Sequence, residues 1–184
     1  MAAVALSPAE IPSATTVAAT LSGDRDAAQA LLVELAPRIR NLVRYLIRDD
    51  VEVDDIAQEA MVSILKNLDQ YRGEGSFTAW VDRITARATF KALARRKRRK
   101  EEPLSPEQVE PAHDAFGEFH SRRRLVTLLD RLPPPQRHVI VLHFVLGMTV
   151  VEIGDELDIS VETVRSRLRL AKAALRRTIE STQR

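Results

Sequence analysis

The clearest chemical signal in the chain is a set of cationic and hydroxyl side chains laid over an apolar repeat in residues 160–177. Apolar residues recur there at steps of three and four, the signature of one buried helical face: Val161, Val164, Leu168, Ala171 and Leu175. Opposite and beside that stripe lie Glu162, Thr163, Arg165, Ser166, Arg167 and Arg169. Arg can bridge O6 and N7 of guanine, and Ser or Thr can bond base edges or phosphates. This face suits DNA, although most basic helical faces are only solvated.

The residues before this helix favour the DNA interpretation. Residues 149–157 are typical of a shorter helix with Thr149 as N-cap, and its apolar side consists of Val150 or Val151, Ile153 and Leu157. A turn of three residues, Asp158 to Ser160, separates the two helices, and Ser160 stands at the N-cap of the second. Gly154 permits the helices to approach closely. The pattern predicts a helix-turn-helix, whose second helix enters the DNA major groove, and leaves a plain pair of packed helices as the alternative.

Composition limits the class of protein. Of the 184 residues 45% are hydrophobic, which is enough for one or two domains with a core, and none is cysteine, which excludes disulfides and thiolate metal sites. No apolar run approaches the roughly 20 residues of a membrane span. Residues 1–20 lack the basic start of a signal peptide and contain Pro8 and Pro12, which predicts a disordered tail. We expect a cytoplasmic protein with no membrane insertion and no cofactor.

Charge is segregated along the chain. Residues 49–59 carry acids and no base, whereas residues 91–100 carry Lys and Arg and no acid. Such blocks predict distinct surfaces for distinct partners.

Apolar periodicity divides the chain into two helical lobes. The first, residues 21–100, opens with a helix carrying Leu31, Leu35, Ile39, Leu42 and Leu46, which Pro37 should kink or interrupt. A second helix starts near Asp54, with Ile56, Ala57, Ala60, Ile64 and Leu68 inward, and a third runs from about Phe77 into the basic block. A loop with Gly73 and Gly75 separates them.

The second lobe follows a linker. Residues 101–118 contain three prolines and six acids but no Lys or Arg, which predicts a flexible connection. Residues 119–184 then predict a helix carrying Leu125, Leu128 and Leu129, a break at the prolines 133–135, a helix through Val139 and Leu142, and the helix-turn-helix. The predicted fold class is all-α, with two small helical domains joined by a flexible linker.

Two stretches give the chain a family resemblance. "DDIAQEAMVSILKNLDQYRGEGSFTAWVDRI" in the first lobe and "LPPPQRHVIVLHFVLGMTVVEIGDELDISVETVRSRLRLAKAALR" in the second resemble regions 2 and 4 of the extracytoplasmic-function (ECF) sigma factors. These are small sigma-70-type initiation subunits of bacterial RNA polymerase. The order of the two stretches, with only a linker between them, makes the resemblance specific over about residues 21–180.

The resemblance implies roles for residues of the first lobe. Asp55, Gln58 and Glu59 match the motif that docks on the β′ clamp helices of core polymerase. The loop at Tyr71, Arg72 and Phe77 matches the element that melts the promoter and captures an unstacked base, with Arg83, Arg87 and Lys91 behind it as phosphate contacts. Trp80 is expected in the core rather than as a base platform. Arg87 and Lys91 stand where many relatives have Asn and Asp, so the base preference of those relatives does not transfer.

For the second lobe, the resemblance implies that Glu162, Thr163, Arg165, Ser166, Arg167 and Arg169 read the upstream promoter element. It also implies a contact with the polymerase β flap, a linker directed towards the polymerase cleft, and an anti-sigma factor as regulator. Asp158 replaces the usual turn glycine, at a modest cost in stability.

Two other functions stay open at this point. A conventional helix-turn-helix regulator would bind duplex DNA without polymerase. A hydrolase would hold a divalent cation on Asp54, Asp55 and Glu59, with His138 or His143 as base. The two histidines are poorly spaced for one helical face, and no phosphate loop or nucleophile elbow is present.

Overall fold

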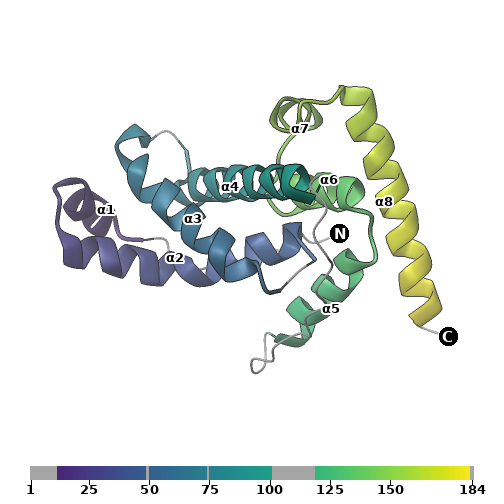
Figure 1. Cartoon of the computed structure of the whole chain (residues 1–184), viewed down its shortest axis with the longest axis horizontal. Coiled ribbons are helices and arrows are strands. Elements are labelled where there is room, and N and C mark those ends of the chain that lie inside the picture. Colours follow the sequence, from purple (N-terminus) through teal and green to yellow (C-terminus); the bar gives the residue numbers. More distant parts are fainter. Residues whose placement is uncertain (1–11, 49, 74, 101–118, 183–184) are drawn as a thin grey trace. The chain divides into compact units, whose positions relative to one another are not determined.

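The computed structural model describes residues 12–48, 50–73, 75–100 and 119–182. Throughout these ranges the regular structure is helical and no strand occurs, as predicted. The elements are α1 (Ala14–Leu21), α2 (Arg25–Leu46), α3 (Val53–Lys66), the short 3-10 turn η1 (Leu68–Gln70), α4 (Phe77–Lys100), α5 (Phe119–Asp130), α6 (Pro134–Phe144), α7 (Val150–Leu157) and α8 (Val161–Thr182) (Figure 1). The predicted linker, residues 101–118, lies outside the described residues.

Contacts divide the described chain into two compact units. The N-terminal unit consists of residues 12–44, 50–73 and 75–100. The C-terminal unit consists of residues 119–182 together with Tyr45–Arg48. This division differs from the domain boundaries predicted at 21–100 and 119–184, because it adds α1 to the first unit and moves the end of α2 to the second.

The start of the chain corrects one prediction. Residues 14–20 were expected to belong to a disordered tail, but they form α1. Ser13 caps this helix, since its hydroxyl accepts a hydrogen bond from the Thr16 N–H at 3.1 Å. No residue of α1 is buried, so this helix contributes nothing to a core. Residues 1–11 of the predicted tail lie outside the described residues.

Helix α2 forms the long axis of the N-terminal unit. Its predicted apolar positions are buried, with Leu31, Leu35, Ile39 and Leu42 at most 1% exposed. Pro37 does not interrupt the helix, which continues through it from Arg25 to Leu46. Proline cannot donate to the carbonyl four residues earlier, which here belongs to Val33. Because Val33 is 67% exposed, water can bond that carbonyl instead.

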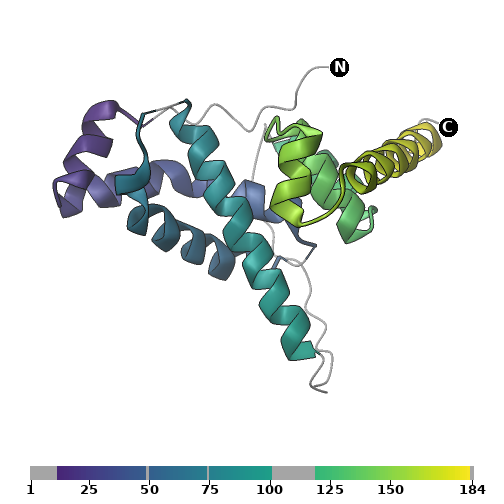
Figure 2. The ribbon, with the colours of Figure 1, turned by 90° about the horizontal axis from the view of Figure 1, so that it is seen from above.

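Helices α3 and α4 pack along one another (Figure 1). The positions predicted to face inward are buried: Ile56, Ala57, Ala60, Ile64 and Leu68. Helix α4 is uninterrupted over its length (Figure 2). Its buried face begins with the ring of Phe77 and is otherwise small and partly polar, with Val81, Asp82, Thr85, Ala86 and Thr89.

In the C-terminal unit, α6 and α7 both pack against α8. The prolines predicted to break the chain also start the next helix: Pro133 is the N-cap of α6, and Pro134 and Pro135 form its first turn. Proline is favoured there because the first helical N–H groups have no partner within the helix. Leu129, Leu132, Val139, Leu142 and Ile153 form a buried apolar core.

Candidate nucleic-acid interface

Helices α7 and α8 form the predicted helix-turn-helix. Thr149 and Glu152 close a capping box at the start of α7, with the Thr149 N–H donating to the Glu152 carboxylate at 2.9 Å and the Glu152 N–H donating to the Thr149 hydroxyl at 3.2 Å. Ser160 caps α8 as predicted, since its hydroxyl accepts from the Thr163 N–H at 3.2 Å. Both helix starts are therefore fixed by side chains that the sequence pattern had singled out.

The turn between the two helices is tight. Asp158, which stands in place of the relatives' usual turn glycine, adopts φ 51° and ψ 52°, a left-handed conformation. Gly154 lies where a side chain cannot be accommodated, because an added Cβ would come within 2.9 Å of the Ile159 carbonyl oxygen. The close approach predicted for Gly154 is confirmed. Together these two residues set the direction in which α8 leaves α7.

The polar face of α8 is divided by exposure. Val164, Leu168 and Ala171 are buried against the unit, as their spacing predicted. Glu162, Arg165, Ser166 and Arg169 are exposed, whereas Thr163 and Arg167 are half-buried. The Thr163 hydroxyl lies 2.9 Å from that of Ser160, so it takes part in the cap. The face open to a ligand consists of the four exposed residues.

An ion pair lies within this exposed face. The Arg165 guanidinium is 3.6 Å from the Glu162 carboxylate, three residues earlier on the same side of the helix. Both side chains are more than half exposed, so the pair adds little stability. It presents a donor and an acceptor side by side, a combination that can be matched to the edges of a base pair.

Three aromatic rings gather at the start of α4. The ring of Phe77 is stacked on Trp80 with centroids 5.6 Å apart, and Tyr71 meets the edge of Phe77 at 5.0 Å. Phe77 is only 6% exposed, while Tyr71 and Trp80 are half-buried. In the free protein the Phe77 ring is therefore covered within the cluster, and its contact with a base stays a prediction. Trp80, expected in the core, is only partly enclosed.

The loop between η1 and α4 is tied to this cluster. The Tyr71 hydroxyl donates to the Gly75 carbonyl at 2.9 Å, which holds the loop closed on itself. Gly73 and Gly75 have φ of +75° and +86°, conformations that glycine adopts without strain. Arg72 is exposed beside them. The loop therefore combines an open backbone, a half-buried ring and an exposed cation.

Helix α4 carries the cations predicted to lie behind the loop. Arg83, Arg87 and Lys91 are exposed and follow one another at steps of four, so they form a row on one side of the helix. This row is compatible with a run of phosphates.

The predicted polymerase-binding residues lie on the exposed face of α3. Asp55, Gln58 and Glu59 are all exposed, and their spacing places them on one side of the helix. They are not alike in their contacts. The Arg95 guanidinium donates to both carboxylate oxygens of Glu59 at 2.6 Å, so Glu59 is already engaged within the unit.

The two charge blocks meet in space, contrary to the expectation of distinct surfaces. Besides Glu59 and Arg95, Glu52 pairs with Arg96 at 2.6 Å across the same two helices, α3 and α4. The acidic block also faces α2, where Asp54 lies 2.8 Å from Arg40 and Asp50 pairs with Arg44. Opposite charges far apart in sequence attract when the helices pack, and the blocks are therefore partly neutralised within the fold. Periodicity alone could not show this.

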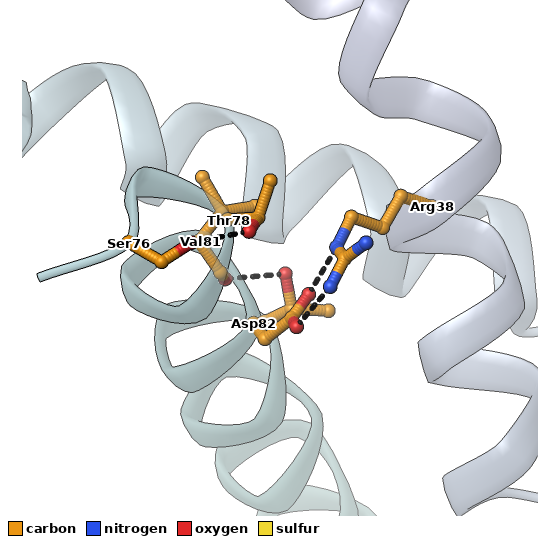
Figure 3. Close-up of polar contacts among 6 residues, drawn as sticks. Arg38, Ser76, Thr78, Val81 and Asp82 are labelled. Carbon is orange, nitrogen blue, oxygen red and sulfur yellow. Dashed lines mark hydrogen bonds and ion pairs between the residues drawn. The ribbon is translucent and has the colours of Figure 1, made fainter. Parts of the chain in front are cut away.

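Two buried ion pairs were not foreseen. Arg38 of α2 and Asp82 of α4 form a two-pronged pair, with both bonds drawn in Figure 3. In the other unit, Arg137 is 1% exposed and pairs with Asp130. The sequence did contain a sign of these buried ion pairs. Asp82 and Arg137 are charged residues at positions where the spacing of apolar residues along the helix requires burial.

The acidic residues of α3 do not form a metal site in the part of the chain that the structure describes. Within the described ranges, no three His, Cys, Asp or Glu side chains lie together in an arrangement that could hold a metal ion. Asp54 and Glu59 pair with arginines instead. The described helices also include none that is long and apolar enough to cross a membrane.

Comparison with protein families gives two matches, one in each half of the chain. Residues 31–99 match the family described as Sigma-70 region 2, and residues 122–175 match Sigma-70, region 4. The first match covers α2 to α4, and the second covers α5 to most of α8.

Individual proteins extend the likeness over the whole chain. The ECF RNA polymerase sigma factor SigE of Mycolicibacterium smegmatis is 31% identical over 179 residues, which cover 92% of this chain and 68% of that protein. The ECF RNA polymerase sigma factor SigM of Mycobacterium tuberculosis is 29% identical over 170 residues, with 92% and 86% covered. SigW of Bacillus subtilis is 26% identical over 172 residues, with 85% and 91% covered.

Solved structures share the fold. The chain resembles CnrH, solved in complex with the cytosolic domain of CnrY, with a TM-score of 0.54 and 24% identity over 91% of this chain and 96% of CnrH. It also resembles the sigma factor RpoE of Bartonella quintana, solved with the anti-sigma factor NepR, with a TM-score of 0.58 and 18% identity over 85% and 98%. At these identities the likeness supports the all-α, two-unit fold and no more.

Proposed function

Since this chain belongs to the sigma-70 family as an RNA polymerase sigma factor of the ECF type, we propose that its two units divide promoter recognition between them. In this proposal the protein is a non-catalytic subunit that directs core polymerase to particular promoters and helps to open them. It acts in the cytoplasm, where the polymerase and the chromosome are.

The C-terminal unit reads the upstream promoter element with α8. The observation that carries this role is the exposed set Glu162, Arg165, Ser166 and Arg169 on a helix whose start is fixed by a capped, left-handed turn. Arg165 and Arg169 can donate to guanine or phosphate, and Glu162 can accept from cytosine. Thr163 and Arg167, also predicted to contact DNA, are half-buried and support this face from its edges.

The N-terminal unit acts at the downstream element. Tyr71 and Arg72 lie in a loop that can approach a single strand, and Arg83, Arg87 and Lys91 continue as a row of cations for phosphates. Phe77 belongs to this site, where in the free protein it is the buried support of Tyr71.

Core polymerase binds the exposed side of α3. Asp55 and Gln58 are exposed there and would face the β′ clamp helices, while Glu59 must exchange Arg95 for a cation of the polymerase. The C-terminal unit would also meet the β flap. Two weak DNA contacts are then enough for promoter recognition, because both units are tethered to one polymerase and each therefore has a high effective concentration at its DNA element.

Regulation by an anti-sigma factor also belongs to the proposal. The sigma factor RpoE of Bartonella quintana was solved with the anti-sigma factor NepR, and CnrH with the cytosolic domain of CnrY. A protein that covers α3 and α8 together would block polymerase and DNA at once.

Footprinting of DNA with and without polymerase tests this function. We expect the purified protein alone to leave the DNA upstream of its own gene unprotected at concentrations where the complex with core polymerase protects two separated elements. Strong protection by the protein alone, unchanged by core polymerase, would instead identify a stand-alone helix-turn-helix regulator. Membership of the sigma factor family does not favour that alternative.

A further inference from the structure

Helix α4 carries the elements proposed to open the promoter, and beyond its first turn its buried side chains are small or polar. Phe77 is buried in the first turn against Tyr71 and Trp80. Further along, the buried apolar residues are Val81 and Ala86, and the buried residues Thr85 and Thr89 are polar. The two threonine hydroxyls donate to carbonyls of the same helix, Val81 at 2.9 Å and Thr85 at 2.8 Å, so they make no bond to a neighbouring element. The rotation of α4 beyond its first turn therefore depends on contacts other than these two hydroxyls.

One buried contact does define that rotation. The Arg38 Nε donates to Asp82 Oδ1 at 2.7 Å, and its Nη2 donates to Oδ2 at 2.6 Å. Figure 3 shows the guanidinium reaching from α2 to the carboxylate on α4 with both bonds parallel. A planar fork meeting a planar carboxylate fixes direction as well as distance. The side chains are 13% and 6% exposed, so water does not compete for these bonds.

Such an ion pair fixes the position of the two helices relative to one another more than it stabilises the fold. Removing two charges from water is costly, and apolar residues of similar size often replace a buried ion pair without loss of stability. Burial raises the pKa of Asp82 in spite of the hydrogen bond and the positive charge from Arg38, which shows that desolvation outweighs the attraction.

The pair lies beside the parts of α4 that matter for DNA. Asp82 follows Trp80 by two residues and precedes Arg83, the first cation of the exposed row. Phe77 and Trp80 pack with Tyr71, so any rotation of the first turns of α4 is passed to the loop as well.

We propose that Arg38 and Asp82 are positioning residues for promoter opening, which set the rotation of α4 so that the loop and the row of cations face the same DNA strand. Neither side chain touches DNA. The inference rests on the proposed function and adds to it two buried residues that belong to neither proposed contact surface.

The test compares a duplex promoter with the same promoter carrying a pre-opened bubble at the start site. The variant Arg38→Met with Asp82→Leu removes both charges together, and Arg38→Lys keeps the charge pair but loses the fork. We expect the double variant to bind core polymerase as the wild type does and to lose about tenfold in transcription from duplex DNA, equivalent to about 1.4 kcal/mol. On the bubble template, transcription above the background of core polymerase alone should return to near the wild-type amount. Arg38→Lys should lie between the two.

A matched control is the exposed pair between α3 and α4. Glu52→Gln with Arg96→Gln removes a 2.6 Å ion pair that is about one third exposed, and should leave both templates unaffected. Equal loss on both templates, loss of core binding or loss of helix content in the Arg38 and Asp82 variants would assign the pair a structural role and overturn the inference, as would full activity on the duplex. Failure of the wild type itself to transcribe either template above core background would instead contradict the proposed function.

Discussion

At the scale of single residues, the turn before α8 shows a compromise between sequence and backbone. Asp158 is held at φ 51°, where most side chains meet the following carbonyl. Aspartate tolerates this conformation better than most residues but less well than glycine. The cost was implied by the family resemblance, because Asp158 stands where the relatives usually have a turn glycine.

Asp158→Gly should therefore stabilise the C-terminal unit by a few tenths to about 1 kcal/mol, since glycine relieves the strain but gains freedom in the unfolded chain. Urea unfolding of the two proteins measures the change. Asp155→Gly is the matched control, because the same substitution at an exposed position within α7 should cost a few tenths of a kcal/mol, the difference between the helix propensities of Asp and Gly. Equal destabilisation by both variants would show that Asp158 is not strained.

His138 gives the C-terminal unit a pH dependence. Burial lowers the pKa of His138 from 6.5 to about 4. The positive charge of Arg137 contributes less than burial to this shift, and that of Arg167 contributes least. A histidine whose pKa is lower in the folded state stabilises the fold only while it is neutral. Its contribution is complete above pH 6.5 and is lost as the pH falls from 6.5 towards 4.

We expect the free energy of unfolding of this unit to decrease by roughly 1 to 3 kcal/mol over that range. His138→Gln, which does not titrate, should show a flatter dependence when unfolding is followed by urea titration at several pH values. An identical slope in both proteins would mean that other groups cause the acid sensitivity.

At the scale of elements, helix existence was predictable and helix position was not. The burial of Leu31, Leu35 and Ile39 in α2, and of Val164 and Leu168 in α8, follows from apolar spacing. Helix α1 was missed because the prediction for residues 1–20 relied on Pro8 and Pro12, which precede the helix. The passage of α2 through Pro37 depends on the exposure of Val33, which only the fold reveals. The pairing of Glu59 with Arg95 and of Arg38 with Asp82 joins residues 36 and 44 positions apart. Local patterns carry no information about such pairs.

In the candidate site too, some features could be predicted from the sequence and others could not. The exposed positions Glu162, Arg165, Ser166 and Arg169 could be predicted, because exposure on a helix follows from its period. The burial of Phe77 could not, because it depends on two other rings, Tyr71 and Trp80.

For α8, the prediction concerns discrimination between promoters. Arg165→Ala should reduce the preference for the correct upstream element by about 1 to 3 kcal/mol, the usual value of a bidentate contact to guanine. Transcription by the reconstituted polymerase from the native element and from single-base variants measures this preference. Arg176→Ala is the control, since this residue is exposed on the same helix but lies more than two turns further on. A uniform loss over all variants would place Arg165 on a phosphate instead.

At the scale of the whole molecule, we propose that the two units recognise a promoter only when both are bound to the same polymerase. Each unit has its own buried core, one along α2 to α4 and one around α6 to α8. A face of α3 is acidic and exposed, while α4 and α8 present exposed cations. The N-terminal unit therefore exposes an acidic and a cationic face, and the C-terminal unit exposes a cationic face on α8.

Among the residues of α3, Asp55 offers the cleanest test of polymerase binding. Reversal of Glu59 would also break its bonds to Arg95 and place two cations together, so loss of activity would have two explanations. Asp55 is exposed, and its replacement leaves the Glu59–Arg95 pair intact. Glu34→Lys makes the same change of charge at an exposed position of α2 and serves as the control.

The most direct measurement is promoter-specific run-off transcription by core polymerase and this protein on the DNA upstream of its own gene. We predict a discrete transcript that requires the protein. The amount of this transcript should be unchanged with Glu34→Lys and should fall at least about tenfold with Asp55→Lys, as expected when a contact of about 1.4 kcal/mol or more is lost. Absence of any protein-dependent transcript, although the protein binds that DNA tightly by itself, would contradict the account.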